Sequence, residues 1–209
     1  LINLIPRLYD TTAGEILIDG VPVNSLSRST LTGAVGLVPQ RPYLFSGSVA
    51  ENLRFGATGA SEEDMWEALD TAQATEFVKD RSTGSGDALA TGLESAVSQG
   101  GTNVSGGQRQ RLCIARALTA RPRIYLFDDS FSALDVTTDA NLRAALNNYT
   151  EGATVIIVAQ RVSTITEADQ ILVLEEGRIV DRGTHEELLA GSDTYREIVD
   201  SQISQEELA

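Results

Sequence analysis

The 209 residues are enough for one large domain, and 42% of them are hydrophobic, which allows a sizeable buried core. The formal charge of −14 argues against a nucleic-acid partner, because phosphate backbones attract basic surfaces. No apolar run reaches the roughly 20 residues that a membrane-spanning helix needs. Any link to a membrane would therefore come through a partner or a missing part of the chain.

Residues 1–8 carry apolar side chains at the i, i+3, i+4, i+7 spacing of a helix with one buried face. Pro6 should end or kink that helix nearby. No capping residue precedes it. We therefore expect the sequence to begin inside an element, with an upstream segment missing.

Short strands are predicted next, at residues 15–19 and 34–38, each bounded by turn residues. From about residue 48 to residue 79 the pattern is helical and polar. Residues 82–102 are rich in glycine and serine and predict a loop. This part of the sequence therefore reads as a helical insertion between strands.

The second half of the sequence alternates strands with helices. We expect buried strands at 124–127, 154–159 and 170–174. Helices are expected at 105–118 and 139–146, and two short ones after a hairpin at 175–180. The alternation predicts an α/β fold with a mainly parallel sheet that is covered on both faces.

The first candidate site is the turn Val104-Ser105-Gly106-Gly107-Gln108, which opens a predicted helix. A serine hydroxyl and glycine amides at a helix N-terminus form an anion site, to which the helix dipole adds. Taken alone, such a turn is also an ordinary helix start.

The second candidate site is Asp128-Asp129, at the end of the apolar run 124–127. A carboxylate at the C-terminal end of a parallel strand is where phosphoryl-transfer folds hold the Mg²⁺ of a nucleotide. The alternative is an aspartate that caps the following turn. The nearby serine–glycine turn favours the metal site.

Together these residues resemble the signature sequence and Walker B strand of ATP-binding-cassette (ABC) proteins, and further motifs follow the family order. Val38-Pro39-Gln40 resembles the Q-loop, Ser132-Ala133-Leu134-Asp135 the D-loop, and residues 155–161 the switch strand. Several ordered motifs are more specific than any one of them.

The resemblance implies a nucleotide-binding domain over residues 1–209 with ATP and Mg²⁺ as cofactors. Its fold would be a P-loop NTPase-like (RecA-like) core with a small antiparallel β part and a helical subdomain inserted over residues 42–118. Asp128 and Gln40 would hold or organise Mg²⁺, and Gln40 would also reach the attacking water. Asp129 would be the catalytic base, and Gln160 would contact the γ-phosphate.

The family also implies partners. Two such domains pair head to tail, so the signature would bind the partner's ATP in trans and Asp135 would cross the interface. The signature residues are Ser105, Gly106, Gly107 and Gln108. Residues 42–53 resemble the segment on which exporters dock the coupling helices of their transmembrane domains. The expected location is the cytoplasmic face of the plasma membrane.

Four features depart from the family pattern. The phosphate-binding loop G-x-x-x-x-G-K-[ST] does not occur, and the only lysine, Lys79, has no glycine loop around it. We expect that loop just upstream of Leu1. We also expect the 209 residues alone to bind ATP very weakly and to have no ATPase activity. Asp129 stands where the family has glutamate, and Gln160 where it has histidine. Gln99 is a milder departure from a common glutamate.

Asp129 is one methylene shorter than glutamate, and Gln160 cannot carry a proton as histidine does. Both substitutions weaken residues that the family uses for ATP hydrolysis, whereas the signature residues match the family pattern. The sequence therefore predicts the degenerate half of a heterodimeric exporter, whose signature completes a partner's competent site.

Two other interpretations stay open. One is a soluble cassette ATPase of the chromosome-maintenance or translation type, against which residues 44–53 argue. The other is a non-hydrolysing regulatory or interaction domain that pairs with an active ABC ATPase. A glycine-lysine-serine loop in the coding sequence upstream of Leu1 would favour the transporter ATPase. A start codon there would favour the interaction domain.

Overall fold

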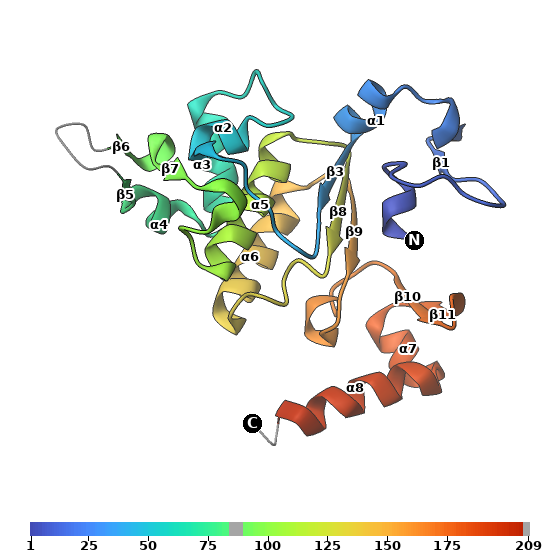
Figure 1. Cartoon of the computed structure of the whole chain (residues 1–209). Helices are drawn as coiled ribbons and strands as arrows, with labels where there is room; N and C mark the ends of the chain where they lie inside the picture. Colours follow the sequence, from blue (N-terminus) through green and yellow to red (C-terminus); the bar gives the residue numbers. More distant parts are fainter. Residues whose placement is uncertain (84–89, 207–209) are drawn as a thin grey trace. The chain divides into compact units, whose positions relative to one another are not determined.

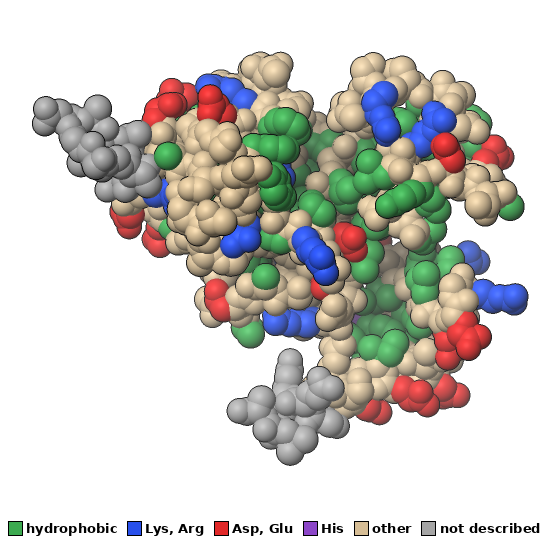
Figure 2. All heavy atoms as spheres, viewed as in Figure 1, with side chains coloured by type: hydrophobic (Ala, Val, Ile, Leu, Met, Phe, Trp, Pro, Cys, Tyr) green, Lys and Arg blue, Asp and Glu red, His purple; other side chains and the backbone are tan. Residues whose placement is uncertain are grey.

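The computed structural model describes residues 1–83 and 90–206 (Figure 1). The chain divides into two compact units, Leu1–Val158 and Ala159–Ala209. No helix in the described ranges is both long and apolar enough to cross a bilayer. Figure 2 shows hydrophobic side chains at the surface of both units.

The centre of the first unit is a parallel sheet of three strands in the order β3–β8–β9. The strands are β3 (Val35–Val38), β8 (Ile124–Asp128) and β9 (Thr154–Val158). All are rich in aliphatic residues, as strands of a parallel sheet between covering layers are. The α/β prediction with a parallel sheet is confirmed.

The two faces of this sheet have different cores. Helices α5 (Gly106–Thr119) and α6 (Val136–Tyr149) lie along one face (Figure 1). Tyr125 and Phe127 of β8 belong to the larger core cluster, which includes leucines of both helices. Side chains alternate along a strand, so Leu126 points the other way and packs with Ile2.

Four α-helices lie between β3 and β8 in the described residues, the first three of them where a polar helical pattern was predicted. They are α2 (Val49–Leu53), α3 (Glu62–Thr71) and α4 (Thr75–Lys79), followed by α5. Capping boxes start α2 and α3, with Ser48 and Ser61 as the caps. The division into a helical subdomain over 42–118 stays a prediction.

Buried Asn52 ties the segment before α2 to the helix. Its side-chain oxygen accepts from the Phe45 amide at 2.8 Å. Its Nδ2 donates to the carbonyls of Phe45 at 2.9 Å and Ser48 at 3.0 Å. One side chain therefore satisfies three backbone groups and sets the shape of residues 45–48.

We expect Asn52→Leu to lower the free energy of unfolding by about 3 kcal/mol, because it leaves backbone groups of Phe45 unpaired beside the core. Urea unfolding of the wild type and the variant measures this. Asn147→Leu, at an exposed position of α6, is the matched control. A loss of less than about 1 kcal/mol for Asn52→Leu would contradict the prediction.

The N-terminal segment differs from the predicted helix. Only a 3₁₀ turn, η1 (Ile2–Leu4), forms, and Leu1 and Leu8 are exposed. Pro6 lies two residues after the end of this turn, and a proline cannot donate the backbone hydrogen bond that an α-helix would need there. The predicted apolar face is therefore wrong, since Ile2 is the buried residue of the turn.

The predicted small antiparallel part is confirmed. Strands β1 (Leu17–Ile18) and β2 (Val21–Pro22) pair antiparallel. Strand β1 lies inside the predicted strand at 15–19, and β2 follows it. They lead into η2 (Val23–Ser25) and then α1 (Arg28–Ala34). Ser27 caps α1 by accepting from the Thr30 amide.

The predicted loop at 82–102 contains short regular elements. Strand β4 (Gly47–Ser48) pairs with β7 (Ala96–Val97), and β5 (Ser82–Thr83) pairs with β6 (Ala90–Thr91). The turns η3 (Gly92–Glu94) and η4 (Gln99–Gly101) complete the segment. Glycine content alone did not reveal these pairings, because each involves only two residues per strand. Residues 84–89 lie outside the described residues.

The prediction that the strand at 154–159 is buried is wrong within the described residues. Val155, Ile156 and Val158 of β9 are each more than a third exposed. The reason is that β9 pairs with β8 on one side only, so its apolar sequence lies at a sheet edge. Such edges offer unpaired backbone groups to another strand.

The second unit is built on an antiparallel hairpin of β10 (Ile171–Glu175) and β11 (Arg178–Gly183), as predicted. The strand predicted at 170–174 is only half buried, since its residues alternate between buried and exposed. The other elements are η5 (Val162–Thr164), α7 (His185–Gly191) and α8 (Asp193–Glu206). Nδ1 of His185 lies 2.8 Å from the hydroxyl of buried Tyr195, which gives the only histidine a structural contact.

Candidate functional site

The sheet brings Gln40 and Asp129 together across 89 residues of sequence. Nε2 of Gln40 donates to Oδ2 of Asp129 at 3.0 Å. Gln40 follows β3 and Asp129 follows β8, and these parallel strands are neighbours. Their carboxyl ends meet at one edge, where open α/β sheets bind ligands.

The backbone of Asp129 is held on both sides. Its amide donates to the carbonyl of Val158 at 2.9 Å, and its carbonyl accepts from the Ser132 hydroxyl at 3.0 Å. Its φ of 47° lies in the left-handed region, which aspartate tolerates better than most residues. The residue is only 8% exposed, so its carboxylate has a defined position beside Gln40.

Asp128 is the last residue of β8 and is half-buried. With the Gln40 amide oxygen it supplies hard oxygen donors of the kind that Mg²⁺ takes. Within residues 1–83 and 90–206, no three His, Cys, Asp or Glu side chains gather to hold a metal. Oxygen donors of this type are those that Mg²⁺ takes together with phosphate and water, and the role of Asp128 and Gln40 in holding it stays a prediction.

The signature turn is a helix N-terminus with a complete capping box. Oγ of Ser105 accepts from the Gln108 amide at 3.2 Å, and Oε1 of Gln108 accepts from the Ser105 amide at 3.1 Å. Gly106 is exposed, and a Cβ built there would meet nothing within 4 Å. Gly106 thus leaves the positive end of α5 open to an anion.

The D-loop residues lie against this turn. A Cβ built on Gly107 would come within 3.6 Å of the Ala133 carbonyl oxygen. Asp135 caps α6, accepting from the Thr138 hydroxyl at 2.7 Å and amide at 3.0 Å. These bonds, the hydroxyl first, hold the pKa of Asp135 below its ordinary value, with a smaller contribution from Arg111. Asp135 is therefore an exposed carboxylate that stays ionised at neutral pH.

Gln160 is the second residue of the second unit and lies two residues after the end of β9. Its side chain is exposed, and its backbone carbonyl accepts from Nε2 of Gln202 at 2.5 Å. A role beside the γ-phosphate stays a prediction.

Sequence reasoning missed two serines that support the site. Buried Ser130 donates its hydroxyl to the Val38 carbonyl at 3.0 Å, which joins the ends of β3 and β8. Ser132, assigned only to the D-loop, holds the Asp129 carbonyl. Serines directly after a strand-end aspartate pair could have suggested such bonds, because short hydroxyl side chains readily bind nearby backbone groups.

An aromatic patch of Tyr43, Phe45 and Phe55 lies on the surface of the first unit, and all three side chains are at least 40% exposed. The ring centroids of Phe45 and Phe55 are 4.4 Å apart, and those of Tyr43 and Phe45 are 5.5 Å apart. The Arg116 guanidinium carbon lies 5.6 Å from the Phe45 ring centroid. Exposed apolar patches are common at interaction sites, and the predicted docking role of this segment stays a prediction.

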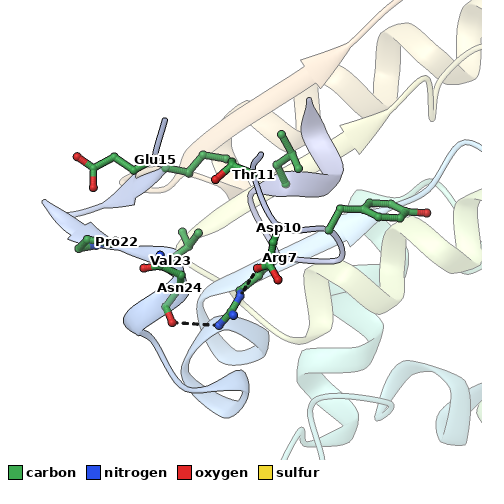
Figure 3. A pocket seen from close by; sticks show the side chains of 10 residues that line it. Arg7, Asp10, Thr11, Glu15, Pro22, Val23 and Asn24 are labelled. Carbon is green, nitrogen blue, oxygen red and sulfur yellow. Dashed lines mark hydrogen bonds and ion pairs between the residues drawn. The ribbon is translucent and has the colours of Figure 1, made fainter. Parts of the chain in front are cut away.

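A hollow of about 280 Å³ lies elsewhere, between the N-terminal segment and β2 (Figure 3). Arg7 crosses it, with Nε donating to Oδ1 of Asp10 at 2.7 Å and Nη1 donating to the Asn24 carbonyl at 3.1 Å. None of the predicted site residues lines it. The hollow is therefore not the predicted nucleotide site.

Known proteins resemble this chain over nearly its full length. An uncharacterized ABC transporter ATP-binding protein of Mycobacterium tuberculosis is 52% identical over 205 residues, 97% of this chain and 34% of that protein. A putative multidrug export ATP-binding/permease protein of Staphylococcus aureus is 41% identical over 198 residues, 95% of this chain and 33% of that protein. The chain spans about a third of the length of these relatives.

A solved bacterial Atm1-family ABC exporter with ATP bound matches with a TM-score of 0.87 and 35% identity, over 96% of this chain and 34% of that chain. The sequence model described as ABC transporter matches residues 1–132. That range holds the predicted Q-loop, the signature and the aspartates that end β8. The chain belongs to the ABC transporter family, and its core has the P-loop NTPase fold of that family.

Proposed function

We propose that this chain is the ATP-binding domain of a membrane exporter, in which its own hydrolysis site is weakened and its signature serves a partner's site. The Gln40–Asp129 hydrogen bond carries the proposal. It supports the proposal because it joins the amide of Gln40 to the carboxylate of Asp129 at the edge where open α/β sheets bind ligands.

Each residue has a chemical role in this proposal. Asp128 and the Gln40 oxygen hold Mg²⁺, which, when bound, neutralises charge on the phosphates. Asp129 accepts a proton from the attacking water, from a position set by Gln40. Gln160 donates a hydrogen bond toward the γ-phosphate without carrying charge. General acid–base assistance is worth about 10²- to 10⁴-fold in rate, and the shorter carboxylate forfeits part of it.

The partner in this proposal is a second ABC nucleotide-binding domain with a competent site, so the transporter is a heterodimer. The open N-terminus of α5 and the capping Ser105 support the trans role, because they suit a phosphate brought from outside the chain. The aromatic patch is the docking surface for transmembrane coupling helices, which places the chain at the cytoplasmic face of the membrane.

Asp128→Asn in the full-length transporter is the direct test. We expect the affinity for Mg²⁺-ATP at this chain's site to fall by at least about 10-fold, because a metal-holding carboxylate is lost. Fluorescent ATP-analogue titration with and without Mg²⁺ measures it. Asp80→Asn, an exposed aspartate after α4, is the control. Unchanged Mg²⁺ dependence in Asp128→Asn would rule out the nucleotide site and favour a non-hydrolysing interaction domain.

A further inference from the structure

One amide side chain of helix α8 binds the backbone on both sides of Arg161. Nε2 of Gln202 donates to the Gln160 carbonyl at 2.5 Å. Oε1 of Gln202 accepts from the Val162 amide at 2.8 Å. We call this pair of bonds the Gln202 clamp. It closes a contact over 40 residues of sequence, between the loop after β9 and the C-terminal helix.

The position of Gln202 follows from the packing of α8. Tyr195, Val199 and Gln202 stand at i, i+4 and i+7, which is one face of a helix. Tyr195 is buried and Val199 is partly buried in the cluster of the second unit, which also contains Val162. Gln202 therefore continues an apolar stripe. Burying a polar side chain at such a position costs free energy unless its hydrogen bonds are made.

The clamp needs both ends of the amide. A glutamine presents one donor and one acceptor on the same planar group, and here each meets a backbone partner of the opposite kind. Two bonds to one rigid group restrict the backbone at Gln160 and Val162 together. The exposed side chain of Gln160 is therefore attached to a stretch of backbone that α8 holds in place.

We propose that Gln202 is a positioning residue for ATP hydrolysis, through which α8 sets the backbone that carries residue 160. This rests on the proposed function, in which residue 160 contacts the γ-phosphate. Gln202 touches neither nucleotide nor water in this scheme. It acts only through the loop, because small misplacement of a group that contacts the reacting phosphate costs much of its contribution to rate.

The test uses Gln202→Leu and Gln202→Glu in the full-length transporter. Leucine fits the apolar stripe but removes both bonds, whereas glutamate keeps the acceptor and places a carboxylate against the Gln160 carbonyl. We expect kcat at this chain's site to fall by about 5- to 10-fold in either variant, as loss of two hydrogen bonds suggests. The KM for ATP should stay within about 2-fold, since the affected contact forms in the transition state. Ser201→Ala is the control, because among the described residues its hydroxyl donates to the Ile198 carbonyl of its own helix.

A double-mutant cycle separates positioning from general stability. If Gln202 acts through residue 160, then Gln202→Leu should change kcat less than about 1.5-fold when Gln160→Ala is already present. Equal losses of kcat in both backgrounds would overturn the proposal, because the effect would then bypass residue 160.

Hydrogen–deuterium exchange gives a readout that does not need activity. Loss of the clamp should speed exchange of a peptide covering residues 158–166 in Gln202→Leu, and not in Ser201→Ala. Unchanged exchange would overturn the clamp itself. Suppose that Gln202→Leu speeds exchange as expected but Asp128→Asn leaves the affinity for Mg²⁺-ATP unchanged. The Gln202 clamp would then be supported, and the proposed function would be wrong.

Discussion

Asp129→Glu combined with Gln160→His should raise ATP turnover at this chain's own site by about 10- to 100-fold, a part of what general acid–base assistance supplies. The measurement is steady-state phosphate release by the full-length transporter in a complex whose partner site has been inactivated. Inactivating that site matters, because a fast partner would hide the change.

The geometry at Asp129 explains the expected direction. The carboxylate is fixed by the Gln40 amide at 3.0 Å and by backbone bonds on both sides of the residue. Because hydrogen bonds hold the backbone of residue 129, the added methylene of glutamate should move the carboxylate outward by about a bond length. The carboxylate should still have one defined position. Histidine at position 160 adds a group that can carry charge toward the phosphate.

Matched substitutions outside the site control for the two chemical changes. Asp80→Glu adds the same methylene at an exposed position, and Gln170→His introduces the same ring at an exposed position of the second unit. Neither should change turnover by more than about 2-fold, as expected for surface substitutions. If the double substitution at 129 and 160 also leaves turnover unchanged, the weakened-site proposal is wrong.

Several elements could be predicted from the sequence because their signals are local. Ser105 followed by Gln108 is a capping box, and α5 starts there as expected. The apolar run that forms β8 ends in the aspartates, so Asp128 and Asp129 lie at the carboxyl edge of the sheet. Spacing and capping need no knowledge of the rest of the chain.

Other features depend on tertiary contacts and could not be read from local patterns. The apolar spacing of residues 1–8 suggested an α-helix, but Pro6 and the packing of Ile2 produced a 3₁₀ turn. The composition of β9 is that of a buried strand, although its edge position leaves it exposed. The Gln202 clamp has no sequence signal, since its two bonds join backbone groups 40 or more residues away in the sequence.

The signature can be tested by Ser105→Asp, which should lower turnover at the partner's site by about 100-fold, comparable to losing one transition-state donor. Aspartate caps helices as well as serine does, so α5 should form as before. The new carboxylate would stand at the helix N-terminus, where the partner's phosphates approach, and like charges repel there. Phosphate release is measured in a complex in which Asp129→Asn silences this chain's own site.

Two comparisons separate charge from capping. Ser105→Ala removes the cap, at a cost of about 1 kcal/mol in stability, but adds no charge, so it should reduce turnover less than Ser105→Asp. Ser27→Asp makes the same change at the cap of α1, where the serine likewise accepts from the amide three residues on, and turnover should stay as in the wild type. Wild-type turnover in Ser105→Asp would mean that this signature completes no partner site. If Ser105→Asp had no effect and the substitutions at 129 and 160 still raised ATP turnover, this chain's own site would hydrolyse ATP, but its signature would not serve a partner's site.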